Sequence, residues 1–345
     1  MGENRKIILV ERPRYRMPTH NCFKLERGPI PEPGEEEFLV RTLWLGLDPY
    51  LHGRMKRVSP QAEPVAIGDV MVGATVGRVE QSNHPAYEPG ELVVGFWGWQ
   101  DYAISNGSRI LKLKTQLEQE HPSYALGALS RLTGLVAYIS IMEISKPRAG
   151  ETVVIGAATG GLGQIAGQLA KLQGTRAVGI AGSQKKCDFA VDELGYDACV
   201  CYKDDDFADQ LKNACPEGVD VYVQTIGGDD LDAVMPLLNL YARMPVLGVI
   251  AMWSAADLPT GPDRTMLFLN QVMTKRLRVE GVVGNDYFQS HFGVFQREMA
   301  TWIRNGDIKI VEHVVPDLED APMALQGMFQ SADEHLGKLV VHVGD

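Results

Sequence analysis

The chain has 345 residues, of which 45% are hydrophobic and 22% charged, and its formal net charge is −11. This length exceeds a single ordinary core, so the composition predicts a soluble globular protein of two domains. The acidic balance argues against nucleic acid and anionic membranes as partners, because both are bound through basic faces.

Apolar run lengths and cysteine usage predict a cytoplasmic protein. Only four consecutive apolar residues precede Glu11, and no run of about 18 apolar residues occurs, so neither a signal peptide nor a membrane span is predicted. The five cysteines are odd in number and irregularly spaced, which is typical of reduced thiols.

The first 120 or so residues have the pattern of short strands separated by turns rich in Pro and Gly. Short strands at this spacing predict a barrel or sandwich-like unit. The predicted strands are 6–13, 23–29, 37–47, 70–82 and 91–104.

From residue 123 the pattern changes to alternating helices and strands. After a helix over 123–144, six apolar strands with five helical crossovers specify an α/β, doubly wound parallel sheet. The predicted strands are 152–158, 175–182, 198–202, 219–227, 243–251 and 277–284, with helices at 160–174, 183–195, 206–215, 230–239 and 263–276.

The tail after Gly284 is too short for a third domain, so we expect it to pack on the first one. Its predicted helices are 291–306 and 321–334, and its predicted strands are 309–315 and 337–344. The expected organisation is a β-rich substrate domain of residues 1–125, completed by about 290–345, and a nucleotide-binding domain of residues 126–289.

A glycine-rich turn follows the first strand of the predicted parallel sheet. The dinucleotide fingerprint G-x-G-x-x-G falls on Ala158, Gly160 and Gly163, so alanine stands at the first position. Small residues allow a sharp turn and let backbone N–H groups approach a pyrophosphate at the helix N-terminus. The turn predicts a bound dinucleotide, whereas Gly167 on the same helix suits plain helix–strand packing.

The end of the second parallel strand predicts which dinucleotide is bound. Enzymes that use NAD usually carry an acidic residue there, which grips the ribose 2′-hydroxyl. This chain has Gly182 and Ser183 instead, followed by Lys185 and Lys186. Serine and lysine can donate to a 2′-phosphate that a carboxylate would repel, so NADPH is favoured over NADH, although either lysine could simply be solvated.

Neither a metal site nor a protein nucleophile is predicted. The cysteines lack C-x₂-C spacing, the eight histidines form no i, i+4 pair, and no G-x-S-x-G elbow occurs. We therefore expect the cofactor to carry the chemistry, with the protein supplying orientation and an electrostatic site.

The order of these parts, with the turn AATGGLG, resembles the medium-chain dehydrogenase/reductase superfamily. Four motifs resemble its zinc-free branch of NADPH-dependent alkenal double-bond and prostaglandin reductases, and the whole chain is similar to NADPH-dependent curcumin reductases. The motifs are LGLDPYLHGRM at 45–55, VVGFWGWQDY at 93–102, VGIAGSQKKC at 178–187 and LPTGPDR at 258–264.

This resemblance implies a Rossmann domain beside a GroES-like domain, and hydride transfer from NADPH to the β-carbon of an enone or enal. It implies that Tyr50 points into a cleft from the N-terminal domain, with a half-buried interface aromatic as the alternative. The implied cofactor contacts are Gly160, Gly161, Gly163, Ser183, Lys186, Tyr202, Thr225, Gly248, Ile250, Trp253, Val282, Val283 and His335. The implied substrate contacts are Tyr50, Met252, Trp253 and Tyr287.

Some positions depart from the family's pattern. Thr225 and His335 each stand where the family usually has Asn, and Trp253 replaces the family's Tyr after the fifth strand. An indole N–H donates a hydrogen bond but is no general acid, so a tyrosine mechanism at that position is in doubt. Tyr50 and Tyr287 then become the candidate proton or hydrogen-bond donors to the developing enolate.

Two other functions compete with the enone reductase. A zeta-crystallin-like quinone reductase would share the fold and cofactor, and a non-catalytic NADPH-binding module would share the binding site alone. In the family that the chain resembles, the sixth strand pairs with its copy across a two-fold axis, so the resemblance implies a homodimer. An apolar strand at the edge of a sheet also needs to be covered.

Overall fold

The structure is a computed structural model that describes residues 2–13, 17–56, 63–250, 264–330 and 335–344. The chain divides into two compact units. Unit 1 comprises residues 1–127, 312–332 and 338–345, and unit 2 comprises residues 128–311 and 333–337.

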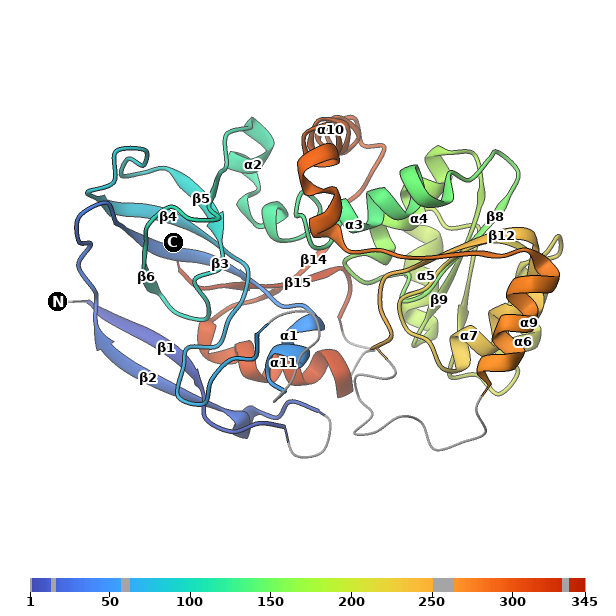
Figure 1. Cartoon of the computed structure of the whole chain (residues 1–345), viewed down its shortest axis with the longest axis horizontal. Helices are drawn as coiled ribbons and strands as arrows, with labels where there is room; N and C mark the ends of the chain where they lie inside the picture. The colour runs from blue at the N-terminus through green and yellow to red at the C-terminus, as the bar shows by residue number, and fades with distance from the viewer. Residues whose placement is uncertain (1, 14–16, 57–62, 251–263, 331–334, 345) are drawn as a thin grey trace. The chain divides into compact units, whose positions relative to one another are not determined.

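Unit 1 is built on β-strands (Figure 1). A hairpin of β1 and β2 pairs in antiparallel fashion, and a larger sheet has the order β14-β15-β3-β4-β5-β7, with β6 paired to β3. The strands are β1 (Glu3–Leu9), β2 (Phe23–Pro29), β3 (Phe38–Gly46), β4 (Thr75–Ser82), β5 (Leu92–Gly95), β6 (Tyr102–Ser105), β7 (Leu111–Lys112), β14 (Glu312–Val315) and β15 (Lys338–His342). The helices are α1 (Tyr50–Arg54), α2 (Gln116–Glu120) and α11 (Ala321–Gln330).

The core of unit 1 joins residues from both ends of the chain. Trp99 is fully buried and stacks on Phe23 at 5.3 Å between ring centroids. The same cluster contains Leu325 of α11 and Val341 of β15, and β15 lies between β14 and β3 in the larger sheet. The C-terminal tail therefore completes the β-rich unit.

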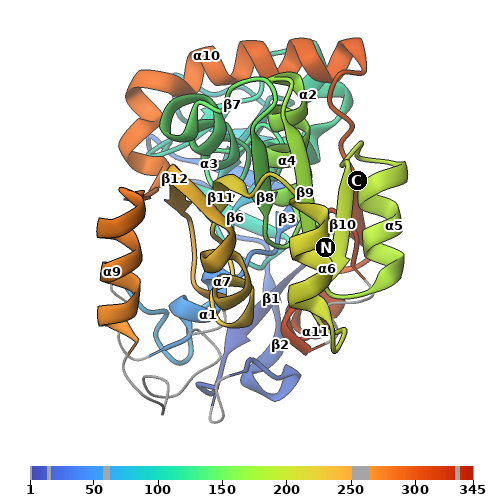
Figure 2. The same cartoon turned by 90° about the vertical axis from the view of Figure 1, so that its right-hand side faces the viewer.

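Unit 2 contains a six-stranded, all-parallel sheet in the order β10-β9-β8-β11-β12-β13 (Figure 2). The chain starts in the middle at β8, runs outward to β10 and then returns to extend the sheet on the other side, as in a doubly wound fold. The strands are β8 (Thr152–Ile155), β9 (Arg176–Ala181), β10 (Ala198–Cys201), β11 (Val219–Val223), β12 (Leu238–Val246) and β13 (Arg278–Gly281).

Helices lie on both sides of this sheet (Figure 2). The apolar run of β8 is buried throughout, as expected of a central parallel strand. One face packs against Phe207, Leu211 and Val234 in a shared cluster. The helices are α3 (Gly134–Tyr138), the π-helical η3 (Ile139–Ser145), α4 (Gly163–Leu172), α5 (Gln184–Asp192), α6 (Phe207–Ala214), α7 (Asp229–Val234), α9 (Thr265–Lys275) and α10 (Gly284–Asn305).

The expected fold class, a Rossmann-like parallel sheet with a separate β-rich N-terminal unit, is confirmed. Three element predictions are wrong. The strand expected over 91–104 is divided into β5, which pairs with β4, and β6, which pairs with β3. The helix expected over 123–144 is divided into a 3-10 turn at Pro122–Leu126, α3 and η3. The helix expected over 230–239 ends earlier, because Pro236 has no N–H to continue it, and β12 begins at Leu238.

The return to unit 1 also comes later than the expected residue 290. Helix α10 belongs to unit 2, where its Phe295 is fully buried and its Glu298 accepts a hydrogen bond from Tyr138 at 2.7 Å. Gly306, in the left-handed region with φ 80°, ends this helix, and the chain reaches unit 1 at Glu312.

Candidate functional site

Most of the candidate residues lie at one edge of the unit 2 sheet. The strands are parallel, so the segments that follow their carboxyl ends meet at the same edge. The glycine turn follows β8, Ser183 follows β9, Tyr202 follows β10, Thr225 follows β11 and Gly248 follows β12. Between β8 and β11 the strand order reverses, and this switch point is where doubly wound folds bind nucleotides.

The glycine turn is shaped by close backbone packing. A Cβ atom on Gly163 would lie 2.2 Å from the carbonyl oxygen of Ala157, so no side chain fits there. A Cβ atom on Gly160 would meet the same oxygen at 3.2 Å, which is much less restrictive. Gly160 and Gly161 are half-buried and follow Ala157, which has a φ of 49°. Gly163 is thus required by packing, whereas packing constrains Gly160 less.

Alanine at the first fingerprint position is explained by the neighbouring strand. Ala158 is fully buried and donates its N–H to the carbonyl oxygen of Ile180 at 3.0 Å. Its Cβ occupies the space where a side chain on Gly179 of β9 would lie, 2.7 Å from that position. Gly179 on β9 therefore provides the space that allows alanine, in place of glycine, at the first position of the turn.

Helix α4, which begins at this turn, is held by Tyr196. The ring lies where a Cβ on Gly167 would be, with Cζ 2.1 Å from that position. The hydroxyl of Tyr196 donates to the carbonyl oxygen of Gly163 at 2.8 Å, and burial raises the pKa of this phenol well above its usual value. Gly167 thus has the packing role that its position predicts.

The N-terminus of α5 distinguishes the two lysines. Lys185 is exposed, whereas Lys186 is buried at 9% exposure. Ser183 is the N-cap residue, and its Oγ is buried without a hydrogen-bond partner in the described part of the chain. The first turn of α5 carries no acidic residue, so helix dipole, hydroxyl and ammonium group together suit a phosphate.

Tyr202 follows β10 and is 40% exposed. Its N–H donates to the carbonyl oxygen of Ala181 at 3.0 Å, which places Tyr202 beside the end of β9. Behind it, Cys187, Cys199 and Cys201 pack together, as core residues are expected to do.

On the other side of the switch point, Thr225 anchors the segment after β12. Its carbonyl oxygen accepts the N–H of Ile250 at 3.3 Å, and Gly248 accepts a bond from the Gln224 amide at 3.3 Å. The Oγ1 of Thr225 and the Oε1 of Gln224 are buried without partners among the described residues. These oxygens provide polar groups at the sheet edge that a ligand can satisfy.

The remaining cofactor candidates lie near the same segments. After β13, Val282 is buried and its N–H bonds to Val246 at 2.9 Å, whereas Val283 is 53% exposed. His335 is half-buried, two residues before Gly337, whose N–H bonds to the carbonyl oxygen of Thr159 in the glycine turn at 2.8 Å. Met252 and Trp253 lie outside the described residues.

The two candidate tyrosines belong to different units. Tyr287 lies in the first turn of α10, half-buried, with its ring 5.6 Å from that of His291, and burial raises its pKa. Tyr50 begins α1 in unit 1 and is half-buried against the core cluster. A phenolic O–H can donate a hydrogen bond, so both side chains carry the group that the proposed chemistry needs.

The motif that contains Tyr50 has structural members as well. Asp48 forms an ion pair with Lys338, a lysine that is only 4% exposed and also donates to the carbonyl oxygen of Leu47 at 2.8 Å. His52 is 1% exposed, and neither ring nitrogen has a hydrogen-bond partner in the described residues. Burial, with a smaller effect of Lys56, lowers the pKa of His52 to about 4.

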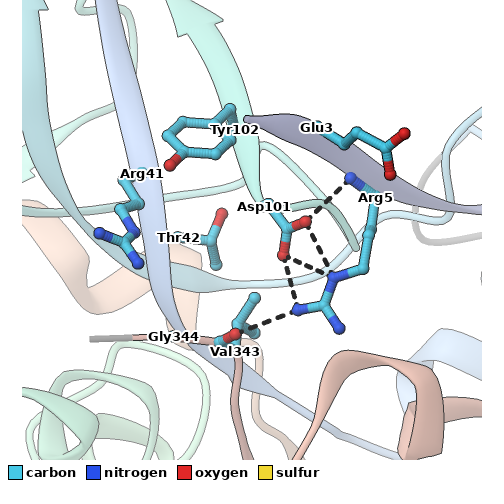
Figure 3. A pocket seen from close by; sticks show the side chains of 8 residues that line it. All are labelled: Glu3, Arg5, Arg41, Thr42, Asp101, Tyr102, Val343 and Gly344. Carbon is cyan, nitrogen blue, oxygen red and sulfur yellow. Dashed lines mark hydrogen bonds and ion pairs between the residues drawn. The ribbon is translucent and has the colours of Figure 1, made fainter. Parts of the chain in front are cut away.

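A cavity of about 190 Å³ in unit 1 contains none of the candidate residues (Figure 3). Two of its charged lining residues form a structural pair, since the Arg5 guanidinium binds Asp101 at 3.0 Å, and Arg5 also binds Asp317 at 2.9 Å. The lining residues are Glu3, Arg5, Arg41, Thr42, Asp101, Tyr102, Val343 and Gly344. We assign this cavity no catalytic role.

Within the described ranges, no group of three or more His, Cys, Asp or Glu side chains is placed to hold a metal ion. Over the same part of the chain, none of the helices has the length and apolar character to cross a bilayer.

Comparison with known proteins places the chain in a family. Residues 5–113 match a family described as the N-terminal domain of oxidoreductase, and residues 161–302 match one described as zinc-binding dehydrogenase. The chain is 43% identical over 340 residues to NADPH-dependent curcumin reductase of Escherichia coli (strain K12), covering 99% of this chain and 97% of that protein. The chain belongs to the medium-chain dehydrogenase/reductase family.

Other members of this family agree in sequence and fold. The NADP(+)-dependent 2-alkenal reductase of Nicotiana tabacum is 35% identical, over 91% of this chain and 89% of that protein. The crystal structure of CurA from Vibrio vulnificus in complex with NADPH matches with a TM-score of 0.94 and 43% identity, covering 99% of both chains.

Proposed function

We propose that this protein is an NADPH-dependent reductase of conjugated C=C bonds in α,β-unsaturated ketones and aldehydes of the curcumin type. The reductases named above act on curcumin and 2-alkenals according to their names, and the matched CurA structure contains NADPH. The observation that carries the cofactor assignment is the end of β9, where buried Lys186 and the unpartnered Ser183 hydroxyl stand at a helix N-terminus without an acidic residue.

The residues at the sheet edge fit a dinucleotide phosphate in charge and in space. The N-terminus of α4 has no side-chain cap and no acid in its first turn, so it suits a pyrophosphate above Gly160 and Gly161. Ser183, Lys186 and Tyr202 would hold the 2′-phosphate. Thr225, Gly248 and Ile250 would hold the nicotinamide end, with Val282, Val283 and His335 as further contacts.

Bound NADPH would supply a hydride to the β-carbon of the substrate. As this occurs, negative charge develops on the substrate carbonyl oxygen, and a hydrogen-bond donor aimed at that oxygen lowers the barrier most. Tyr50 and Tyr287 are the candidate phenolic donors, and the indole N–H of Trp253 is a third. The enolate would then take a proton at its α-carbon, and Tyr50 and Tyr287 are the candidate donors.

The deciding experiment mixes the purified protein and NADPH with curcumin, a 2-alkenal or a quinone, and follows the absorbance of the reduced nicotinamide. We expect cofactor oxidation with curcumin and the alkenal, and a product that has lost its conjugated C=C bond by mass spectrometry. Turnover of the quinone alone would select a quinone reductase. Tight NADPH binding without turnover of any acceptor would select a non-catalytic binding protein.

Lys186→Met is expected to weaken NADPH binding by about 10- to 100-fold, because a charge-assisted bond to the 2′-phosphate is lost. Binding of NADH, which lacks this phosphate, should change little. The matched control is Lys185→Met, which removes the exposed neighbouring charge. Fluorescence titration of both cofactors measures the effect, and equal NADPH affinity in Lys186→Met and the wild type would refute the assignment.

We also propose a cytoplasmic homodimer formed through β13 and α9. Strand β13 is an edge of the parallel sheet, and its Val279 is 38% exposed. Helix α9, which packs on β12, exposes Met266 at 72% and Met273 at 69%. An apolar face of this kind beside an open strand edge needs a cover, and a second copy pairing β13 with β13 supplies one.

Light scattering of the wild type is expected to give twice the mass of one chain. Met273→Glu should shift the population toward monomer, because it places a carboxylate in the apolar face. Met323→Glu on α11 is the matched control, since Met323 is also exposed but lies in unit 1. A wild-type monomer, or a Met273→Glu dimer as stable as the wild type, would count against this interface.

A further inference from the structure

Asp230 is a buried carboxyl group at the edge of the sheet that binds the proposed cofactor. It lies in the first turn of α7, directly after the segment that follows β11, and is 3% exposed. Its Oδ2 has no hydrogen-bond partner among the described residues. The adjacent Asp229 is exposed, so the two acids of this turn have opposite environments.

The Asp230 carboxyl and the Thr225 hydroxyl both approach Gly156, at the start of the glycine turn. The Thr225 Oγ1 is 2.9 Å, and the Asp230 Oδ2 3.5 Å, from the position of a Cβ on Gly156, so glycine there leaves space for both oxygens. The hydroxyl of Tyr222 on β11 is also buried without a partner among the described residues, and it interacts electrostatically with Asp230. Three unsatisfied polar groups therefore gather at the switch point.

A buried carboxylate without a partner is costly to keep in a folded protein, because a buried charge needs an opposite charge or a hydrogen-bond donor to stabilise it. Burial, with a smaller effect of Asp229, raises the pKa of Asp230 to about 7. Asp229 on the same helix and Tyr222 on β11 are the titratable groups that act on it in the described chain, and no lysine or arginine is among them. A carboxyl retained at this cost beside a ligand site suggests a role in binding.

We infer that Asp230 is a positioning residue for the cofactor, which acts through the Thr225 hydroxyl to fix the acceptor for a ribose hydroxyl at the end of β11. This inference rests on the proposed function. A carboxylate attracts the hydrogen of the Thr225 hydroxyl through one shared water molecule, and leaves the threonine lone pairs to accept from the ligand. Protonated Asp230 instead donates to that water, which then donates to Thr225, and this acceptor is weakened.

The topology indicates which part of the dinucleotide is involved. We expect the 2′-phosphate at the end of β9 and the pyrophosphate at the N-terminus of α4, which follows β8. The dinucleotide then extends across the carboxyl end of β8, and its second ribose lies at the carboxyl end of β11. A ribose offers hydroxyl donors, which a carboxylate-oriented threonine can accept, whereas a phosphate there would be repelled.

The test compares NADPH dissociation constants of the wild type, Asp230→Asn and Asp229→Asn at pH 6 and pH 8, measured by fluorescence titration. At pH 6 Asp230 is largely protonated, so Asp230→Asn should bind nearly as well as the wild type. At pH 8 we expect Asp230→Asn to bind about tenfold more weakly. Asp229→Asn should match the wild type at both pH values. The 2′-phosphate also titrates near pH 6, but this contribution is common to all three proteins.

A purely structural role for Asp230 would weaken binding equally at both pH values, and that result would overturn the inference, as would wild-type affinity at both. Asparagine removes a buried charge, so thermal melting of Asp230→Asn at or above the wild-type temperature shows that the variant is folded. Thr225→Val gives a second approach, because Asp230→Asn should have no further effect in that background. Failure of the wild type to bind NADPH at all would instead refute the proposed function.

Discussion

Replacing Gly167 with alanine is expected to destabilise the protein by about 3 kcal/mol. The new Cβ would lie 2.1 Å from Cζ and 2.2 Å from the hydroxyl oxygen of Tyr196. The ring would have to move and give up its 2.8 Å bond to Gly163, so overpacking and a lost buried hydrogen bond add together. The helix propensity of alanine offsets only about 1 kcal/mol of this. Urea unfolding followed by circular dichroism measures the change.

The control is another glycine inside a helix. A Cβ on Gly293 of α10 would meet only Arg297 Nη1, at 3.7 Å, so Gly293→Ala should stabilise the protein by about 0.5–1 kcal/mol. In a Tyr196→Ala background the cost of Gly167→Ala should disappear, because the ring is gone. Wild-type stability of Gly167→Ala would show that Tyr196 does not define this position.

His52 is expected to make the protein sensitive to acid. Its pKa is about 4 in the folded protein, against an ordinary value of 6.5, so between these values the unfolded chain binds a proton that the folded chain does not. The stability that the neutral, buried His52 side chain contributes is therefore fully present above pH 6.5. It is lost as the pH falls toward 4, because protonation of this histidine then favours the unfolded chain. The loss between pH 7 and pH 4 amounts to about 3 kcal/mol.

His52→Leu removes the titrating side chain, and with it the pH-dependent contribution to stability, and leaves no unpaired ring nitrogen in the core. We expect the variant to be at least as stable as the wild type at pH 7 and to lose about 3 kcal/mol less on acidification to pH 4. Free energies of unfolding in urea at the two pH values give this difference, and the exposed His20→Gln serves as the control. If His52→Leu and the wild type lost equal stability in acid, the burial of a neutral His52 would be disproved.

The parallel sheet was predictable because its strands carry simple signals. Buried apolar runs such as β8, separated by helical periods and glycines, leave few alternative topologies. The failures lie where several signals compete. Residues 123–144 have helical spacing throughout, but tertiary packing breaks them into short 3-10, α and π segments, and propensity alone does not reveal such breaks. Likewise, nothing in its own sequence assigns α10 to unit 2; its contacts with Tyr138 do.

The positions of the sheet-edge candidates were predictable for a related reason, since residues that directly follow parallel strands lie at the same edge of the sheet. The sequence could not show that Lys185 is exposed and Lys186 buried, because their burial depends on which side of helix α5 faces the sheet. Asp230 was missed because its neighbour Asp229 makes the turn look like an ordinary acidic helix start. The pairing of Asp48 with Lys338 was also missed, since 290 residues separate them.

The place of β15 in the larger sheet of unit 1 has a consequence for biosynthesis. This strand is translated after β1 to β14, yet it lies between β14 and β3. Proteins usually fold their N-terminal domain first as the chain emerges from the ribosome. Here β3 pairs early with β4 and β6, but its segment 44–46, which pairs with β15, must wait while nearly the whole of unit 2 is made. The N-terminal unit is thus expected to be the last to close, and its nascent form the one most in need of a chaperone.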